Sequence, residues 1–154
     1  MSVADKALAY LESHNVMTLA TAGSEGLWAA AVFYVNDGWT LFFLSSPRTR
    51  HGRNILAGAG VAATIQEDYG RWTAIQGIQL EGEVQRIEGE ERDAAIERYA
   101  AKFSVTADPA QHEIRQALRK VAWFRLLPRR LHFIDNSLGL GHRDEVPLGQ
   151  EDGG

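Results

Sequence analysis

The chain has 154 residues, enough for one domain with a sizeable core, because a domain of this size removes roughly 70% of its unfolded surface from water. Its hydrophobic share of 45% and charged share of 23% are those of an ordinary globular protein, which argues against disorder. The net charge of −4 offers no positive field to a nucleic-acid backbone, and the lack of cysteine excludes disulfides, thiolate metal sites and cysteine nucleophiles.

The N-terminus, Met1–Asp5, has no basic region followed by an apolar core, so we expect a cytoplasmic protein. The longest apolar run, residues 27–35, is far shorter than the roughly 20 residues that span a bilayer, and no membrane segment is expected. The five histidines show no metal-ligand spacing, so no metal site is expected either. We expect one domain over residues 1–148 and a disordered tail over residues 149–154.

The first half of the chain predicts a helix followed by hairpin strands. Ser2 and Asp5 have the spacing of a helix cap. Apolar runs bounded by turn residues predict strands at residues 16–21, 27–35, 39–45 and 61–65. The run at 27–35 is almost entirely apolar, which predicts cover on both faces, and the turn Asn36–Gly38 predicts that it pairs with the next strand. A short helix is expected from Thr49 to Ala57.

The second half predicts one long strand, two helices and a last strand. The long strand covers residues 72–87 and should bend at Gly77 or Gly82. Helices should begin at Gly89, where acidic residues suit the helix dipole, and at Asp108–Pro109, where Asp caps and Pro begins a helix.

The last strand, residues 123–134, contains Pro128-Arg129-Arg130 and should therefore be bulged or interrupted. The strands thus follow in hairpin succession and not in the βαβ alternation of a parallel sheet. We expect a mainly β (α+β) fold, an antiparallel six-stranded barrel with peripheral helices.

Residues 41–55 carry the clearest chemical signal. An apolar strand ends at Ser45-Ser46-Pro47 and is followed by Thr49, Arg50, His51 and Arg53. Hydroxyls and backbone N–H groups at a helix start can surround an anion, and an arginine donates charge-assisted hydrogen bonds to its oxygens. Composition alone favours the plainer alternative of a Ser-Pro turn and a solvated basic helix end.

Four motifs lie in one order and spacing: Trp28 to Tyr34, Thr49-Arg50-His51, Gly77 to Gln79, and Asp135 to Gly141. With them, residues 16–136 resemble the pyridoxamine 5′-phosphate oxidase-like FMN-binding split barrels, and within that superfamily a small uncharacterised bacterial branch. The resemblance implies that the barrel is split, that the protein is a homodimer, and that FMN lies at the subunit interface.

The resemblance also implies the residues that bind the cofactor: Ala30, Ala31, Val32, Phe33, Leu44, Ser45, Ser46, Thr49, Arg50, His51 and Gln79. The phosphate would lie at residues 45–51 and the isoalloxazine ring along the strand edge at residues 30–33. Gln79 would face the flavin, from the partner subunit, and its amide could bond the ring's polar edge.

Two departures argue against oxidation of pyridoxamine phosphate itself. Ala29 stands where the true oxidase has an arginine for the FMN phosphate, and Tyr34 stands where it has a lysine for the substrate phosphate. The Asp135–Gly141 segment fits either a structural turn or a part of the cofactor cleft.

The expected function is therefore that of an FMN-dependent oxidoreductase acting on a small molecule, with no residue assignable as catalytic acid or base. Three alternatives remain open: an FMN carrier or sensor without turnover, a haem-binding relative, and a cofactor-free interaction barrel.

Overall fold

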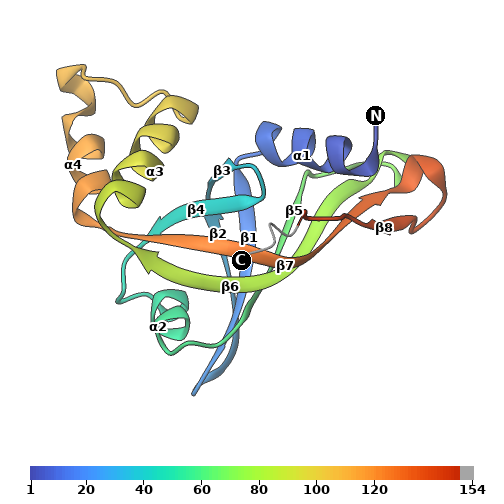
Figure 1. Cartoon of the computed structure of the whole chain (residues 1–154), viewed down its shortest axis with the longest axis horizontal. Coiled ribbons are helices and arrows are strands. Elements are labelled where there is room, and N and C mark those ends of the chain that lie inside the picture. The colour runs from blue at the N-terminus through green and yellow to red at the C-terminus, as the bar shows by residue number, and fades with distance from the viewer. Residues whose placement is uncertain (150–154) are drawn as a thin grey trace.

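The computed structural model describes residues 1–149 and shows a strongly curled antiparallel sheet with helices at its ends (Figure 1). The α-helices are α1 (Val3–Ser13), α2 (Arg50–Leu56), α3 (Gly89–Lys102) and α4 (His112–Lys120), with 3-10 turns η1 (Trp72–Ala74), η2 (Pro109–Gln111) and η3 (Asn136–Leu138). No helix among the described residues is long and apolar enough to cross a membrane. Of the tail predicted at 149–154, residues 150–154 lie outside the described part.

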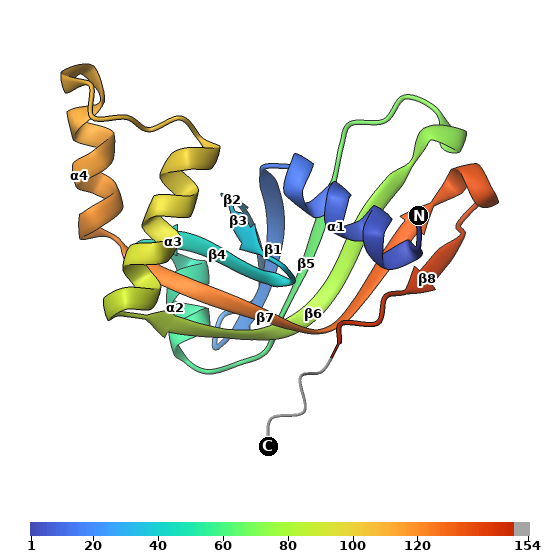
Figure 2. The same cartoon turned by 45° about the horizontal axis from the view of Figure 1, so that its top comes forward.

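The strands are β1 (Val16–Gly23), β2 (Gly26–Phe33), β3 (Val35–Asp37), β4 (Thr40–Ser45), β5 (Val61–Gln66), β6 (Gln76–Ile87), β7 (Ala122–Asp135) and β8 (Arg143–Glu145). Their order is β2-β1-β5-β6-β7-β4-β3, every pairing is antiparallel, and β8 adds to β7. Because the sheet curls, β2 lies beside β4 without pairing with it (Figure 2). This open seam makes the barrel split, as predicted, with eight strands where six were expected.

Local sequence signals explain several element boundaries. Ser2 and Asp5 form the predicted capping box at α1. The pairing of β6 with β7 shifts register between Glu81 and Gly82. A Cβ on Gly82 would lie 2.3 Å from the Leu127 carbonyl oxygen, so only glycine allows this close approach. The last strand is therefore continuous and bulged, and is not broken.

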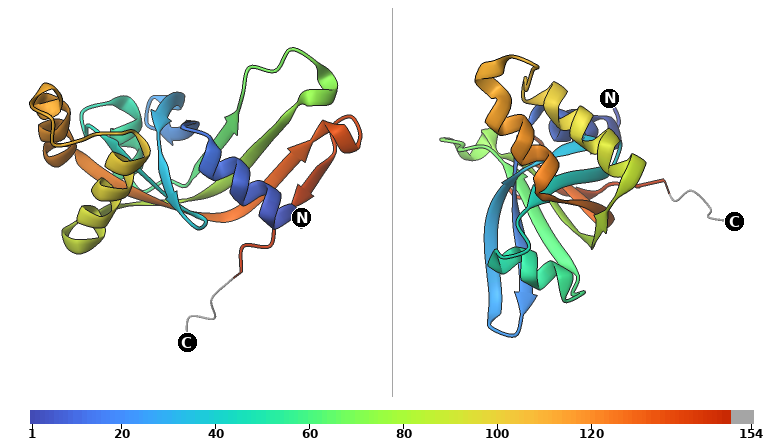
Figure 3. Two further views of the ribbon diagram at one scale, coloured as in Figure 1. Left: turned by 90° about the horizontal axis from the view of Figure 1, so that it is seen from above. Right: turned by 90° about the vertical axis from the view of Figure 1, so that its left-hand side faces the viewer.

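Two apolar clusters hold the fold together. The larger fills the curled sheet with side chains such as Met17, Leu19 and Phe43. The smaller packs β3, β4 and β7 against α3 and α4, which stand together at the end of the sheet opposite β8 (Figure 3). Trp123 lies fully buried there and its indole N–H donates to the Leu118 carbonyl at 2.7 Å. The α3–α4 pair thus covers Trp123, which belongs to the core of the single chain.

Other sequence expectations also need correction. The apolar run at 27–35 is not covered on both faces: Leu27 is 84% exposed and Phe33 53%. It is also not one strand, because it breaks at Tyr34, and only β3 pairs with β4. β2 instead forms the opposite edge of the sheet, since it pairs along its whole length with β1.

Two boundaries in the second half differ as well. The long strand begins at Gln76, because Trp72–Ala74 forms a 3-10 turn. The helix predicted at Pro109 starts as η2 and continues as α4. On α4 only Leu118 is buried, because α4 extends beyond the sheet and leaves Ile114 exposed.

Candidate functional site

The turn between β4 and α2 is held tightly by its own residues. Thr49 has an extended backbone and caps α2, since its Oγ1 accepts a hydrogen bond from Gly52 N at 3.1 Å. A Cβ on Gly52 would lie 2.4 Å from the Ser46 carbonyl oxygen. The close packing of Gly52 on Ser46 therefore fixes where the first turn of α2 stands against the end of β4.

This turn gathers three of the predicted phosphate-binding side chains. Ser45 Oγ lies 2.5 Å from His51 Nε2 and 3.3 Å from Thr49 Oγ1, and Thr49 Oγ1 lies 3.5 Å from His51 Nε2. The Thr49 hydroxyl donates to the Ser46 carbonyl at 2.8 Å, so its proton is already used. The Ser45 proton therefore bonds either His51 or Thr49, depending on the state of the imidazole.

Burial lowers the pKa of His51 below its usual range, which favours the neutral imidazole at neutral pH. An anion placed against the cluster would favour the protonated ring instead, because opposite charges stabilise each other. The backbone N–H groups at the first two positions of α2, Arg50 and His51, have no acceptor within the helix itself. The cluster thus combines hydroxyls, a titratable ring and backbone donors.

Arg50 points away from this cluster, toward the turn between β1 and β2. Its Nη2 donates to the carbonyls of Glu25 at 3.0 Å and Leu27 at 3.4 Å, and its guanidinium lies 4.5 Å from the centre of the Trp28 ring. Its Nε is buried and has no hydrogen-bond partner within residues 1–149. Arg53 lies nearby, donating to the Arg48 carbonyl at 2.7 Å.

The predicted ring-binding residues lie along the open edge of the sheet. Ala30 and Val32 pair with the buried Leu19 and Met17 of β1 and share their face, whereas Ala31 and Phe33 face the other way. Among the described strands, β2 pairs only with β1. Backbone N–H and C=O groups on its free edge are therefore available to a ligand or another chain.

Leu44 and Gln79 do not join the cluster within one chain. Leu44 packs on the α3 side of β4, next to the smaller apolar cluster. Gln79 lies on β6, opposite Thr64 and His132, and accepts a long hydrogen bond of 3.5 Å from Arg143. The structure thus joins Ser45, Thr49 and His51 directly and leaves Gln79 on a separate surface.

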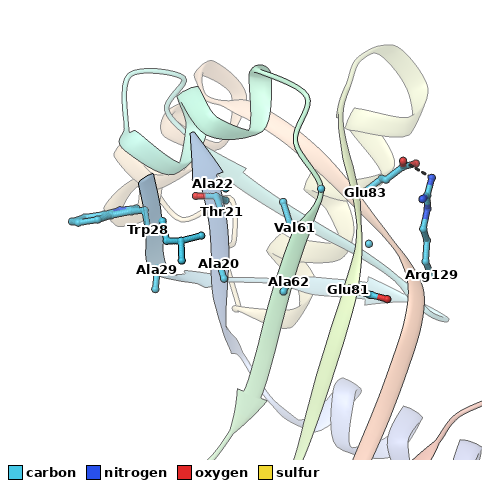
Figure 4. A pocket seen from close by; sticks show the side chains of 13 residues that line it. Ala20, Thr21, Ala22, Trp28, Ala29, Val61, Ala62, Glu81, Glu83 and Arg129 are labelled. Atoms are coloured by element: carbon cyan, nitrogen blue, oxygen red, sulfur yellow. Dashed lines mark hydrogen bonds and ion pairs between the residues drawn. The ribbon is translucent and has the colours of Figure 1, made fainter. Parts of the chain in front are cut away.

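A cavity of about 780 Å³ lies beside the site and was missed from the sequence. Its lining includes Ala29, Ala20 and Ala62, which lie side by side in register on the neighbouring strands β2, β1 and β5 (Figure 4). An ion pair between Glu83 and Arg129 stands on its far side. The volume is that of a small-molecule pocket. The sequence signal for this cavity was the alternation of small residues in β1. That alternation indicates a cavity only when the register with the neighbouring strands is known.

The two departures from the oxidase pattern have clear structural roles. Tyr34 is fully buried, and its hydroxyl donates to the Leu11 carbonyl at 2.6 Å. It therefore fixes α1 to the barrel and is closed to a substrate. Ala29 lies on the cavity floor and brings no charge.

The Asp135–Gly141 segment is a structural turn within this chain. The Asn136 amide donates to the Trp72 carbonyl at 2.9 Å and its oxygen accepts from Gly141 N at 3.1 Å, so the side chain ties η1 to η3. This end of β7 is remote from Ser45, which pairs with Ala122 at the other end of the strand. Within residues 1–149, no three His, Asp or Glu side chains gather as a metal site would require.

Comparison with known proteins agrees with this architecture. Residues 3–135 match the family model described as pyridoxamine 5′-phosphate oxidase. The chain is 34% identical over 136 residues to a UPF0306 protein of Photorhabdus laumondii, covering 87% of this chain and 88% of that one.

Solved structures are similar at lower identity. A haem-binding protein from Mycobacterium smegmatis superimposes with a TM-score of 0.72 at 26% identity, covering 96% of this chain and 59% of that one. The haem storage protein of Vibrio cholerae gives a TM-score of 0.70 at 20% identity, with 85% and 94% covered. From the seam, the sheet order and the family match together, the chain belongs to the pyridoxamine 5′-phosphate oxidase family.

Proposed function

We propose that this protein is an FMN-binding flavoprotein that carries out redox chemistry on a small molecule. The observation that carries the proposal is the cluster of Ser45, Thr49 and His51 at the start of α2, beside the free edge of β2. Phosphate is bound in proteins by hydroxyls, cations and first-turn N–H groups. Hydroxyls and first-turn N–H groups meet here, and His51 is the group that becomes a cation when an anion binds. The family to which the chain belongs supports FMN as the phosphate-bearing ligand.

The residues at the seam fit the cofactor in two further ways. Arg50 Nε is a buried donor without a hydrogen-bond partner in the described chain, and its nearest anion is the Glu25 carboxylate at 3.9 Å. Such a donor is costly unless a ligand or water accepts its hydrogen bond. The free edge of β2 could pair with the carbonyl and N–H groups of a flavin ring. In this account Ser45, Thr49 and His51 hold the phosphate, and Ala30 to Phe33 line the ring.

When bound, FMN supplies the hydride and electron transfer, while the chain binds, orients and shields the ring. The proposal does not extend to oxidation of pyridoxamine phosphate. Tyr34 is buried and bonded to Leu11, and Ala29 is uncharged, so neither could bind a phosphate as the oxidase residues at these positions do. The substrate is accordingly proposed only as a small molecule, in a cytoplasmic setting.

We further propose that the working form is a homodimer with the cofactor between the two subunits. Leu27, Phe33 and the 75%-exposed Trp72 leave apolar surface uncovered in the single chain. Apolar surface of this kind usually marks an interface. Gln79, which is remote from the cluster in one chain, would then reach the cofactor of the other.

Haem binding is the second candidate, because the similar proteins from M. smegmatis and V. cholerae are described as haem-binding and haem-storage proteins. A haem iron needs an axial ligand such as His, Cys, Met or Tyr. The cavity of about 780 Å³ has none of these four residue types in its lining, so a haem would take its ligand from outside the cavity, with His51 of the cluster as the candidate.

The visible absorption spectrum of the purified protein, before and after addition of FMN or haemin, tests both candidates. We expect the two-banded absorption spectrum of oxidised flavin. Denaturation of the protein should then release the bound flavin as free FMN. The flavin proposal would be wrong, and haem binding would take its place, if the protein bound no FMN and haemin produced a Soret band that saturates at one haemin per chain. No uptake of either would leave only the cofactor-free barrel.

A further inference from the structure

Helix α2 is fastened to strand β1 by a buried polar contact that has no part in the proposed phosphate cluster. The side chain of Asn54 is buried, and its Nδ2 donates to Thr21 Oγ1 at 3.0 Å. Thr21 is buried as well. A polar pair inside an apolar core is tolerated because each group satisfies the other, and breaking one member leaves the other unsatisfied.

A third residue, Gly23, leaves the space that the Asn54 side chain occupies. A Cβ on Gly23 would lie 2.0 Å from Asn54 Oδ1 and 2.7 Å from its Cγ, so any larger residue would displace the amide. The backbone of Gly23 does not need glycine for its own conformation, because it is an ordinary paired residue of β1 opposite Gly26. Its small size therefore serves the packing of Asn54.

The contact stands at a position that controls the site. Asn54 follows His51 by three residues and Arg50 by four, so it lies one turn further along the same side of α2. Thr21 pairs with Trp28 of β2, and the Trp28 ring carries the Arg50 guanidinium at 4.5 Å. The four residues form a closed loop that joins the helix with the phosphate cluster to the strand with the free edge.

We infer that Asn54 is a positioning residue, which through Thr21 holds the phosphate cluster of α2 at a fixed distance from the ring-lining edge of β2. This inference rests on the proposed FMN function. Asn54 touches no ligand in this account. It acts because one ribityl chain of limited length joins the phosphate of FMN to its ring, so the protein must bind both ends in a single bound conformation.

The test compares FMN with riboflavin, which has the same ring and no phosphate, by flavin fluorescence titration of the full chain. Thr21→Val keeps the shape of the side chain and removes the hydrogen bond, whereas Thr21→Ser keeps the hydroxyl and removes a methyl group. We expect Thr21→Val and Asn54→Ala to lower the FMN-to-riboflavin affinity ratio by about three- to tenfold, the worth of one buried hydrogen bond. Thr21→Ser should retain the wild-type ratio.

If the contact served only stability, Thr21→Val and Asn54→Ala would unfold more easily but leave the ratio unchanged, since the affinities for FMN and riboflavin would fall by the same factor. If wild type prefers FMN and Thr21→Val keeps that preference, the role of Asn54 is overturned and the FMN proposal stands. If wild type binds neither flavin, both are overturned. If Asn54→Ala does not fold, Thr21→Val and Thr21→Ser still decide, because their side chains are close in size to threonine.

Discussion

The two edges of the curled sheet face each other across the seam, yet their apolar side chains are buried to very different degrees. On one side of the seam the sheet ends in the short strand β3, which covers only the start of β4, and we call this side the β4 edge. Here Phe43 is fully buried in the barrel and Phe42 packs toward α3. At the β2 edge, Phe33 is half exposed and Leu27 almost fully so. Both strands are apolar in sequence. The difference is that α3 and α4 cover one of them, and within the described residues nothing comparable covers the other.

This contrast separates two uses of apolar strands. The β4 edge contributes to the stability of the single chain, while the β2 edge keeps its backbone groups and side chains free for a ligand or a second subunit. The four experiments below compare the two edges, beginning with the largest expected effect.

A matched pair of phenylalanine truncations compares the edges directly. Phe43→Ala should lower the free energy of unfolding by about 3–5 kcal/mol, because it opens a cavity in a packed core. Phe33→Ala should cost less than about 1.5 kcal/mol in the isolated chain, since it mainly loses an aromatic contact with Phe103 at 5.0 Å. Urea unfolding at several protein concentrations measures both. Equal losses at the lowest concentration would show that the β2 edge is covered within one chain.

A charge on β2 tests whether a second subunit covers it. Ala31→Glu places a carboxylate on the exposed face of β2, and burying it unpaired at an interface should weaken dimerisation about hundredfold, or by about 3 kcal/mol. Ala101→Glu adds the same charge at an exposed position of α3 and should leave dimerisation unchanged. Sedimentation equilibrium measures the association. A wild-type monomer at micromolar concentration, or an unaffected Ala31→Glu dimer, would contradict the proposed interface.

Arg50 and Arg53, the two arginines beside the β2 edge, should differ in how much they contribute to FMN binding. Arg50→Ala should weaken FMN binding about ten- to a hundredfold, because it removes charge-assisted hydrogen bonds worth roughly 1.5–3 kcal/mol. Binding requires the guanidinium to exchange its contacts with Glu25 and Leu27 for the phosphate. Arg53→Ala should lose less than about 1 kcal/mol, as expected of an exposed charge.

Fluorescence titration with FMN measures both arginine variants, and urea unfolding without FMN provides the control. Without the ligand, Arg50→Ala should lose its stacking on Trp28, worth less than about 1 kcal/mol, and its exposed hydrogen bonds to the Glu25 and Leu27 carbonyls. The urea control measures this structural loss apart from the loss of FMN affinity. Equal FMN affinity for wild type and Arg50→Ala, or a larger loss in Arg53→Ala, would mean that the phosphate lies elsewhere.

The smallest effect belongs to His51 at the β4 edge. Burial lowers its pKa in the free protein, and a bound phosphate would raise it, so binding takes up a proton. FMN affinity should therefore increase as the pH falls from about 8 to about 5.5, beginning near the pKa of His51 in the complex and levelling off below its lowered pKa in the free protein. His51→Gln is the control, because it retains the titration of the FMN phosphate itself near pH 6. Parallel pH profiles of wild type and His51→Gln would exclude His51 as a phosphate ligand.

The sequence predicted well wherever the cause of a structure is local. The cap at Ser2 and Asp5 and the helix that follows Thr49 depend on neighbours within a few residues, and both are confirmed. The same holds for the joining of Ser45, Thr49 and His51, which a tight turn brings together over seven residues. The mainly β, antiparallel barrel was also predicted, because turns and alternation are visible in sequence, whereas the prediction of a split barrel came from the family resemblance.

The sequence could not determine which element covers which surface. The sequence of an apolar strand is the same whether a helix, a second subunit or nothing lies against it, so the exposure of β2 was mispredicted. Register across non-adjacent strands is equally invisible, and with it the row of Ala29, Ala20 and Ala62. Asn54 fits between Thr21 and Gly23, and Gly23 is 31 residues away from it along the chain. This contact likewise depends on tertiary packing. Local propensities decide which elements form, whereas long-range burial decides what they face.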